Sequence, residues 1–128
     1  MDEKREESST RKLLLVEDHS GTAEALKRLL RRAGFDVRLA ASVAEACELA
    51  KGESFALVIT DLRLSDGTGV DVLQQLRLNS NPRGIVLSGL LEDGDEERLT
   101  AVGADRIFTK PADWNLLLEA VSELTAGG

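Results

Sequence analysis

The stretch Phe55-Ala-Leu-Val-Ile-Thr-Asp61-Leu-Arg-Leu-Ser-Asp-Gly-Thr-Gly69 decides the fold of this chain. It begins with apolar and β-prone residues, and a strand with so few polar side chains is typical of a parallel sheet covered on both faces. The run ends in the carboxylate of Asp61, which a glycine-rich turn follows. Open α/β sheets bind their ligands at the carboxyl ends of the strands, so Asp61 is a candidate for chemistry. Its alternative role is to cap the turn.

The rest of the chain alternates between short apolar segments and segments with helical periodicity. Strands are predicted at residues 12–16, 35–41, 55–60, 85–88 and 106–109. The helices between them are predicted to end at Gly34, Gly52, Asn79–Pro82 and Gly103. Ser42 with Glu45 predicts a capping box, and Thr68 predicts a further helix start. This alternation indicates a doubly wound α/β fold, in which helices cover both faces of a parallel sheet.

Length and composition bound the possible functions. With 128 residues, 42% of them hydrophobic, the chain is long enough for one domain with a sizeable core. Residues 1–11 are charged, so we predict a disordered tail there, without a signal region, and a folded domain at residues 12–126. A lone Cys47 and a lone His19 fit a reducing, cytoplasmic setting and argue against a disulfide or a zinc site. The net charge of −7 argues against nucleic acid as a direct partner, and no apolar run suits membrane contact.

Polar side chains that can do chemistry follow four of the predicted strands. They are Glu17 and Asp18 after the first strand, Asp61 after the third, Ser88 after the fourth and Lys110 after the fifth. In a parallel sheet these strand ends share one edge, so side chains far apart in the sequence meet in one cleft. Carboxylates crowded in this way favour a bound cation, and ligands that are all oxygen favour Mg²⁺. A lysine and a hydroxyl beside them suit an incoming phosphoryl group, whose oxygens need neutralising.

Four motifs together resemble the receiver domain of two-component response regulators. They are Val16-Glu17-Asp18, the Asp61–Gly69 turn, Val86-Leu87-Ser88-Gly89 and Phe108-Thr109-Lys110-Pro111. The resemblance covers about residues 12–126. It implies a flavodoxin-like (βα)5 fold, a three-layer sandwich whose five-stranded parallel sheet has the order 2-1-3-4-5. It also implies a function in two-component phosphorelay signal transduction.

The resemblance assigns roles to the acids of the cleft. Asp61 is expected to accept a phosphoryl group from the phosphohistidine of a histidine kinase, in a reaction that depends on Mg²⁺. Asp18, the Asp61 carboxylate and the backbone carbonyl of Arg63 are expected to ligate the ion. Glu17 is expected to act through a metal-bound water. Such a domain phosphorylates and dephosphorylates itself, so we do not expect a turnover enzyme.

The resemblance also assigns roles to Lys110 and Ser88. Lys110 would pair with Asp61 and then with the phosphoryl oxygens, and a cis Lys110–Pro111 peptide is expected to aim it into the cleft. Ser88 would hydrogen-bond the attached phosphoryl group. The implied partners are a histidine kinase or histidine phosphotransfer domain and a downstream protein target. One candidate docking surface for the kinase, with a solvated face as its alternative, is the basic helix with Lys27, Arg28, Arg31 and Arg32.

Several features depart from the family pattern. Ile107 stands three residues before Lys110, where the family has Tyr or Phe, and Phe108 lies on the alternate face of that strand. Arg63, two residues past Asp61, is large enough to lie over a phosphoryl group and hinder water, and a solvated arginine is the alternative. The last predicted helix carries no Lys or Arg, which argues against the activated dimer of winged-helix DNA-binding regulators.

Alternatives of other classes stay open from the sequence. A receiver-like interaction module that is never phosphorylated is one of them, because Ile107 replaces the family's aromatic. A Mg²⁺-dependent aspartyl-phosphate phosphatase is another, but its nucleophile would belong to the first strand, where this chain has Glu17-Asp18-His19. Within the receiver interpretation, the domain either stands alone or belongs to a larger chain such as a hybrid histidine kinase.

Overall fold

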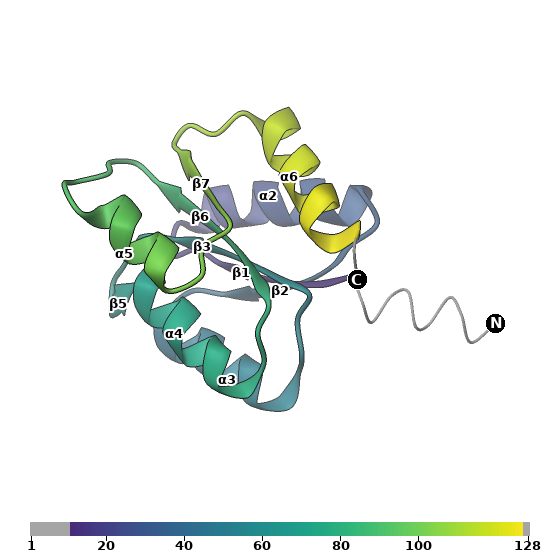
Figure 1. Cartoon of the computed structure of the whole chain (residues 1–128). Helices are drawn as coiled ribbons and strands as arrows, with labels where there is room; N and C mark the ends of the chain where they lie inside the picture. Colours follow the sequence, from purple (N-terminus) through teal and green to yellow (C-terminus); the bar gives the residue numbers. More distant parts are fainter. Residues whose placement is uncertain (1–10, 127–128) are drawn as a thin grey trace.

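Five parallel strands form the centre of the protein, in a computed structural model that describes residues 11–126 (Figure 1). The strands of the sheet are β1 (Lys12–Val16), β2 (Asp36–Ala40), β3 (Leu57–Asp61), β6 (Arg83–Ser88) and β7 (Arg106–Thr109). Their spatial order is β2-β1-β3-β6-β7, which confirms the predicted order 2-1-3-4-5 when the strands of this sheet are counted along the chain. A short antiparallel hairpin, β4 (Arg63–Leu64) with β5 (Gly67–Thr68), follows β3.

The helices cover both faces of the sheet, as the alternating pattern predicted. They are α2 (Ser20–Arg32), α3 (Val43–Gly52), α4 (Gly69–Asn79), α5 (Asp95–Ala101) and α6 (Trp114–Ala126). Helices α2 and α6 lie on one face, and α3, α4 and α5 lie on the other (Figure 1). The three layers confirm the doubly wound α/β fold.

Two apolar cores lie between the sheet and its helices, because successive strand residues point to opposite faces. In β1, Leu13 and Leu15 belong to the core under α2 and α6, whereas Leu14 and Val16 belong to the core under α3, α4 and α5. Every residue of β3 is buried. This burial on both faces is the property that the apolar run before Asp61 predicted, and it fixes the end of β3 as a rigid support for that carboxylate.

Local capping positions the helices that follow the strands. The Thr68 hydroxyl accepts from the Asp71 N–H and the Asp71 carboxylate accepts from the Thr68 N–H, so a complete capping box starts α4 where Thr68 was predicted to start it. At α3, the Ser42 hydroxyl accepts from the Glu45 N–H as predicted. In a complete capping box the Glu45 carboxylate would accept from the Ser42 N–H, but it accepts from the Ala41 N–H, one residue earlier.

Gly69 lets the loop after Asp61 fold back on β3. Its N–H donates to the Leu62 carbonyl at 2.7 Å, and a Cβ at this position would lie 2.7 Å from the Asp61 carbonyl oxygen. Real side chains do not tolerate that distance, so the close approach requires glycine. The glycine-rich turn of the sequence therefore has a steric cause.

The predicted tail at residues 1–11 lies outside the described residues except for Arg11. The Arg11 guanidinium stacks over the Phe35 ring at 4.5 Å from the centroid and donates to the Ala33 carbonyl. Within the described residues, the first element is β1 at Lys12 and the last is α6, which ends at Ala126. The bounds of the domain at 12–126 stay a prediction. Among residues 11–126, no helix is both long enough and apolar enough to cross a membrane.

Candidate functional site

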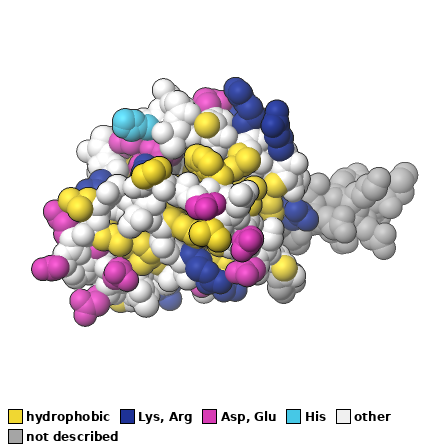
Figure 2. All heavy atoms as spheres, turned by 90° about the horizontal axis from the view of Figure 1, so that it is seen from above, with side chains coloured by type: hydrophobic (Ala, Val, Ile, Leu, Met, Phe, Trp, Pro, Cys, Tyr) yellow, Lys and Arg dark blue, Asp and Glu magenta, His cyan; other side chains and the backbone are white. Residues whose placement is uncertain are grey.

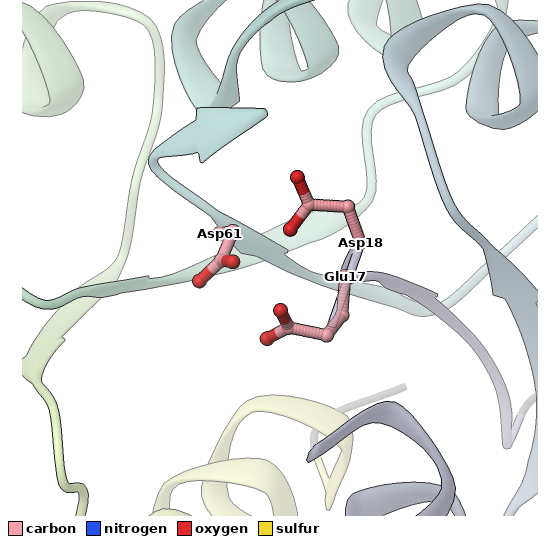
Figure 3. A group of neighbouring side chains, drawn as sticks. All are labelled: Glu17, Asp18 and Asp61. Carbon is pink, nitrogen blue, oxygen red and sulfur yellow. The ribbon is translucent and has the colours of Figure 1, made fainter. Parts of the chain in front are cut away.

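Three carboxylates meet at the carboxyl edge of the sheet. Glu17 and Asp18 follow β1, and Asp61 ends the neighbouring strand β3, which pairs with β1 in parallel. One oxygen of each side chain lies within 4.8 Å of an oxygen of the other two, and Figure 3 shows the carboxylates turned toward a common point. Glu17 and Asp61 are buried, whereas Asp18 is exposed at the mouth of the site. The predicted convergence of these three acids is confirmed.

Lys110 reaches the same cluster from the end of β7, which is an edge strand of the sheet. Its Nζ lies 2.5 Å from Asp61 Oδ1 and 3.1 Å from Glu17 Oε1. The Lys110–Pro111 peptide is cis, as expected. Burial works to lower the pKa of the Lys110 ammonium, but its hydrogen bonds to Asp61 and Glu17 outweigh burial and raise it. Lys110 is therefore a permanent cation in the site at neutral pH.

The Asp61 carboxyl binds a proton more tightly than an ordinary aspartate does. Its pKa is raised from 3.8 to about 6, because burial, the largest cause, and the neighbouring Glu17 raise it more than Lys110 lowers it. One ammonium is not enough to compensate two buried carboxylates in one place. A perturbed carboxyl of this kind in a cleft is typical of a functional site.

The chemistry of the donor set fits a small divalent cation. The three side chains offer carboxylate oxygens only, which suit a hard ion such as Mg²⁺ and give no preference to a soft transition metal. With all three ionised and Lys110 protonated, the cluster carries a formal charge of −2, which a divalent cation would balance. Asp18, which lies at the exposed mouth, would meet the ion first.

The Ser88 hydroxyl lies at the end of β6, next to β3, but it bonds to the loop beyond its own strand. Its Oγ donates to the Leu90 carbonyl at 2.6 Å and accepts from the Leu90 N–H at 3.2 Å. The side chain is buried, at 3% exposure, so this pair of bonds satisfies a hydroxyl that water does not reach. The role predicted for Ser88, a bond to an attached phosphoryl group, requires rotation away from Leu90.

The Arg63 side chain is half exposed and pairs with two acids at the other end of the β6–α5 connection. Its Nη2 lies 2.9 Å from Asp95 Oδ2 and 3.2 Å from Glu92 Oε1, so the guanidinium joins the loop after β3 to the start of α5. The side chain is half exposed, in line with the solvated interpretation, but it is paired with these two acids. Its predicted position over an attached phosphoryl group stays a prediction.

Two acids of the site region escaped sequence reasoning. Asp95 is buried and accepts hydrogen bonds from Arg63, Arg98 and the Glu92 N–H. Asp66, in the loop after Asp61, accepts from the N–H groups of Val43 and Ala44 and thereby caps α3. These backbone hydrogen bonds hold the pKa of Asp66 below its usual value. No local spacing signals such contacts between distant loops.

The residues expected to read out a signal differ from the family pattern as the sequence predicted. Ile107 packs into the core under α3, α4 and α5, whereas Phe108 packs into the core under α2 and α6. The aromatic ring of this strand is therefore on the wrong side of the sheet to contact α5.

The comparisons with known proteins agree with this geometry. The family model of the response regulator receiver domain matches residues 13–122. The cell cycle transcriptional regulator CtrA of Caulobacter vibrioides is 37% identical over 101 residues, which cover 78% of this chain and 44% of CtrA. This chain thus spans less than half the length of CtrA, and it covers 26% of the response regulator PilR of Pseudomonas aeruginosa, at 38% identity.

Solved structures agree as well. The receiver domain of the Francisella response regulator 1452 superposes with a TM-score of 0.83 at 26% identity, covering 91% of this chain and 97% of that one. A response regulator from Burkholderia pseudomallei with a phosphorylated aspartic acid, a calcium ion and citrate has a TM-score of 0.79 at 31% identity, over 91% of this chain and 72% of that chain. The chain belongs to the response regulator receiver domain family of two-component signalling.

Proposed function

We propose that Asp61 accepts a phosphoryl group from the phosphohistidine of a histidine kinase or a histidine phosphotransfer domain, and that the domain signals through altered protein contacts. The observation that carries this proposal is the position of the Asp61 carboxylate, buried between the acid pair and the Lys110 ammonium. The Burkholderia relative carries a phosphorylated aspartic acid, which supports the same type of modification here.

The proposed transfer needs a nucleophile, a charge partner and a site for the phosphoryl oxygens. An ionised Asp61 oxygen forms a bond to phosphorus while the bond from phosphorus to the imidazole nitrogen breaks. The imidazole leaves with that electron pair and keeps the proton on its other nitrogen. The Lys110 ammonium, 2.5 Å from Asp61 Oδ1, moves its hydrogen bonds to the phosphoryl oxygens as charge develops on them.

Glu17, Asp18 and Asp61 would hold Mg²⁺, with the backbone carbonyl of Arg63 as a further ligand and Glu17 acting through a water. The ion supplies neutralisation of the oxygens on the entering group, which otherwise meet three carboxylates. Ser88 then exchanges its hydrogen bond with Leu90 for one with the phosphoryl group. Water attack on the acyl phosphate reverses the modification, so the domain is a reversible switch and no turnover enzyme.

The surface beside the site suits a helical partner that presents a phosphohistidine. A cavity of about 380 Å³ opens beside Lys110 and is lined by Thr22, Leu87, Pro111, Ala112 and Trp114. Figure 2, which looks down on the face that α2 and α6 cover, shows hydrophobic side chains across its middle, acidic side chains among them and basic side chains at several places around them. Helix α2 contributes four cations to this region, Lys27, Arg28, Arg31 and Arg32. We assign the kinase contact to this face and the cytoplasm as its setting.

Incubation with acetyl phosphate and Mg²⁺, followed by intact-mass spectrometry, tests the proposal. A mass gain of one phosphoryl group is expected, lost in Asp61→Asn, lost on chelation of Mg²⁺, and retained in the exposed control Glu48→Gln. A gain that persists in Asp61→Asn would refute the assignment of the acceptor. No gain in the wild type would favour the interaction module that is never phosphorylated, and turnover of phosphate esters would favour the phosphatase.

A further inference from the structure

The connection between β6 and α5 consists of residues 89–94 (Figure 1). Two side chains from elements next to Asp61 hold it: Ser88 at the end of β6 and Arg63 at the start of β4. Ser88, on the strand beside β3, binds both backbone groups of Leu90. Arg63, two residues beyond Asp61, binds Glu92 and Asp95 at the other end of the same connection. The conformation of this segment therefore depends on one side chain at the end of the strand beside β3 and on one side chain that follows Asp61 by two residues.

Asp95 organises the first turn of α5. Its Oδ2 accepts from the Glu92 N–H at 2.7 Å and from Arg63 at 2.9 Å, and its Oδ1 accepts from Arg98 at 2.5 Å. The side chain is 3% exposed, although the Arg63 side chain that covers it is half exposed. Since a buried carboxylate needs compensating donors, loss of Arg63 weakens the packing of this turn.

Phosphorylation changes what attracts Arg63. An acyl phosphate carries about two negative charges and three acceptor oxygens, where Asp61 carried one charge. Lys110 is already shared by Asp61 and Glu17, so it balances only part of the increase. Arg63 is close in sequence, half exposed and able to rearrange, and its planar guanidinium matches a phosphoryl group better than an ammonium does.

We propose that Arg63 transmits phosphorylation of Asp61 to helix α5. In the unphosphorylated protein Arg63 is held by Glu92 and Asp95 and keeps the start of α5 in place. The phosphoryl group draws the guanidinium away, and the first turn of α5 becomes free to change its contacts. This inference rests on the proposed function, and it gives the domain a readout that does not use the aromatic residue that Ile107 replaces.

The coupling is reciprocal by thermodynamic linkage. A partner that binds the released form of α5 would favour the phosphorylated state of Asp61. A partner that binds α5 with Arg63 in place would favour the unphosphorylated state. The equilibrium shifts only as far as the difference in binding free energy between the two forms.

Amide hydrogen exchange of the full chain tests the inference. Beryllofluoride with Mg²⁺ serves as the phosphoryl probe, and exchange is followed at residues 95–101. In the wild type the probe is expected to accelerate exchange in the first turn of α5 about fivefold, a change typical of losing a partly exposed ion pair. In Arg63→Gln, amide exchange in the first turn of α5 is expected to be about as fast without the probe. Addition of the probe should then accelerate that exchange by less than about twofold.

Arg98→Gln is the matched control, because Arg98 binds the same carboxylate from α5 itself and is not tied to the loop after Asp61. It is expected to accelerate exchange while keeping the full response to beryllofluoride. The double variant Arg63→Gln/Asp95→Asn should show the same amide exchange as Asp95→Asn alone, because each of the two changes removes the same contact between Arg63 and Asp95. If these two changes add, Arg63 does not act through Asp95.

Two results separate this inference from the proposed function. If acetyl phosphate modifies Asp61 but Arg63→Gln responds to beryllofluoride as the wild type does, the inference is wrong and the proposed function stands. If Asp61 gains no phosphoryl group in the wild type, both are wrong. Arg106→Gln, which removes an exposed pair with Glu123 at 3.1 Å, should change neither measurement.

Discussion

Substitution of Asp61 by Asn should stabilise the protein at neutral pH in the absence of divalent cations. The ionised carboxylate is buried beside Glu17, and its pKa is raised from 3.8 to about 6. A difference of about two pH units between the unfolded and folded states corresponds to roughly 3 kcal/mol at pH 7.5. Because Lys110 keeps Glu17 at 3.1 Å as its partner, the variant leaves no unpaired ammonium. We expect a gain of about 1–3 kcal/mol in the free energy of unfolding.

The pKa shift of Asp61 also fixes how the free energy of unfolding changes with pH. The folded state holds the Asp61 proton more tightly than the unfolded state, so between about pH 4 and 6 the folded state binds more protons. The contribution of Asp61 to stability is therefore lost as the pH rises through that window. The variant and the wild type should differ little near pH 4 and diverge up to about pH 6. Above that pH the difference should stay constant.

Urea unfolding followed by circular dichroism measures the stability gained in Asp61→Asn and its dependence on pH. The proteins are compared at pH 4, 5, 6 and 7.5 with a chelator, and the exposed substitution Glu48→Gln serves as a control that should show no such dependence. Millimolar Mg²⁺ should stabilise the wild type and reduce the advantage of the variant, because only the wild type has all three carboxylates. A variant that is less stable than the wild type at pH 7.5, or a difference that does not vary with pH, would refute the reasoning.

Three further predictions concern the support of the site. Asp18→Asn should weaken Mg²⁺ binding at least about tenfold in a calorimetric titration, and an unchanged affinity would remove Asp18 from the ligand set. Gly69→Ala should cost about 1–3 kcal/mol in urea unfolding, because its Cβ would lie 2.7 Å from the Asp61 carbonyl oxygen. Asp66→Ala should lower the melting temperature by roughly 2–5 °C by uncapping α3. Since the Asp66 pKa is held below 3.8, that loss should fade as the pH falls below this value, and a loss that persists in acid would contradict the capping role.

The fold was predictable because it depends on patterns that are local in the sequence. Apolar runs identified the strands, glycines marked the ends of three helices, and β3 is buried throughout as its composition required. Parallel pairing then follows from the helical segments between the strands. The proximity of four side chains could then be predicted from the fold, because the carboxyl ends of parallel strands share one edge of the sheet. These side chains are Glu17, Asp18, Asp61 and Lys110.

The contacts that sequence reasoning missed are of another kind. Arg63 and Asp95 are separated by 32 residues, and Asp66 and Val43 by 23. Each pair joins two loops, where no periodicity specifies which side chains face each other. Ser88 illustrates the same difficulty, because its position was predicted but its hydrogen bonds to Leu90 depend on the path of the loop beyond it.

The loop after Asp61 makes side-chain contacts with two helices, and the difference between these contacts decides which helix responds to phosphorylation. Asp66 attaches it to α3, and Arg63 attaches it to α5. The attachment to α3 consists of two N–H groups in the first turn of that helix, which have no acceptor within the helix, whereas the attachment to α5 is an ion pair of a half-exposed arginine. An additional negative charge at Asp61 offers the N–H groups of α3 no better acceptor than Asp66, but it offers the Arg63 guanidinium a stronger partner than Asp95. Movement should therefore begin at α5 while α3 stays in place, and the face formed by α5 and the 89–94 connection is where phosphorylated and unphosphorylated forms should differ most.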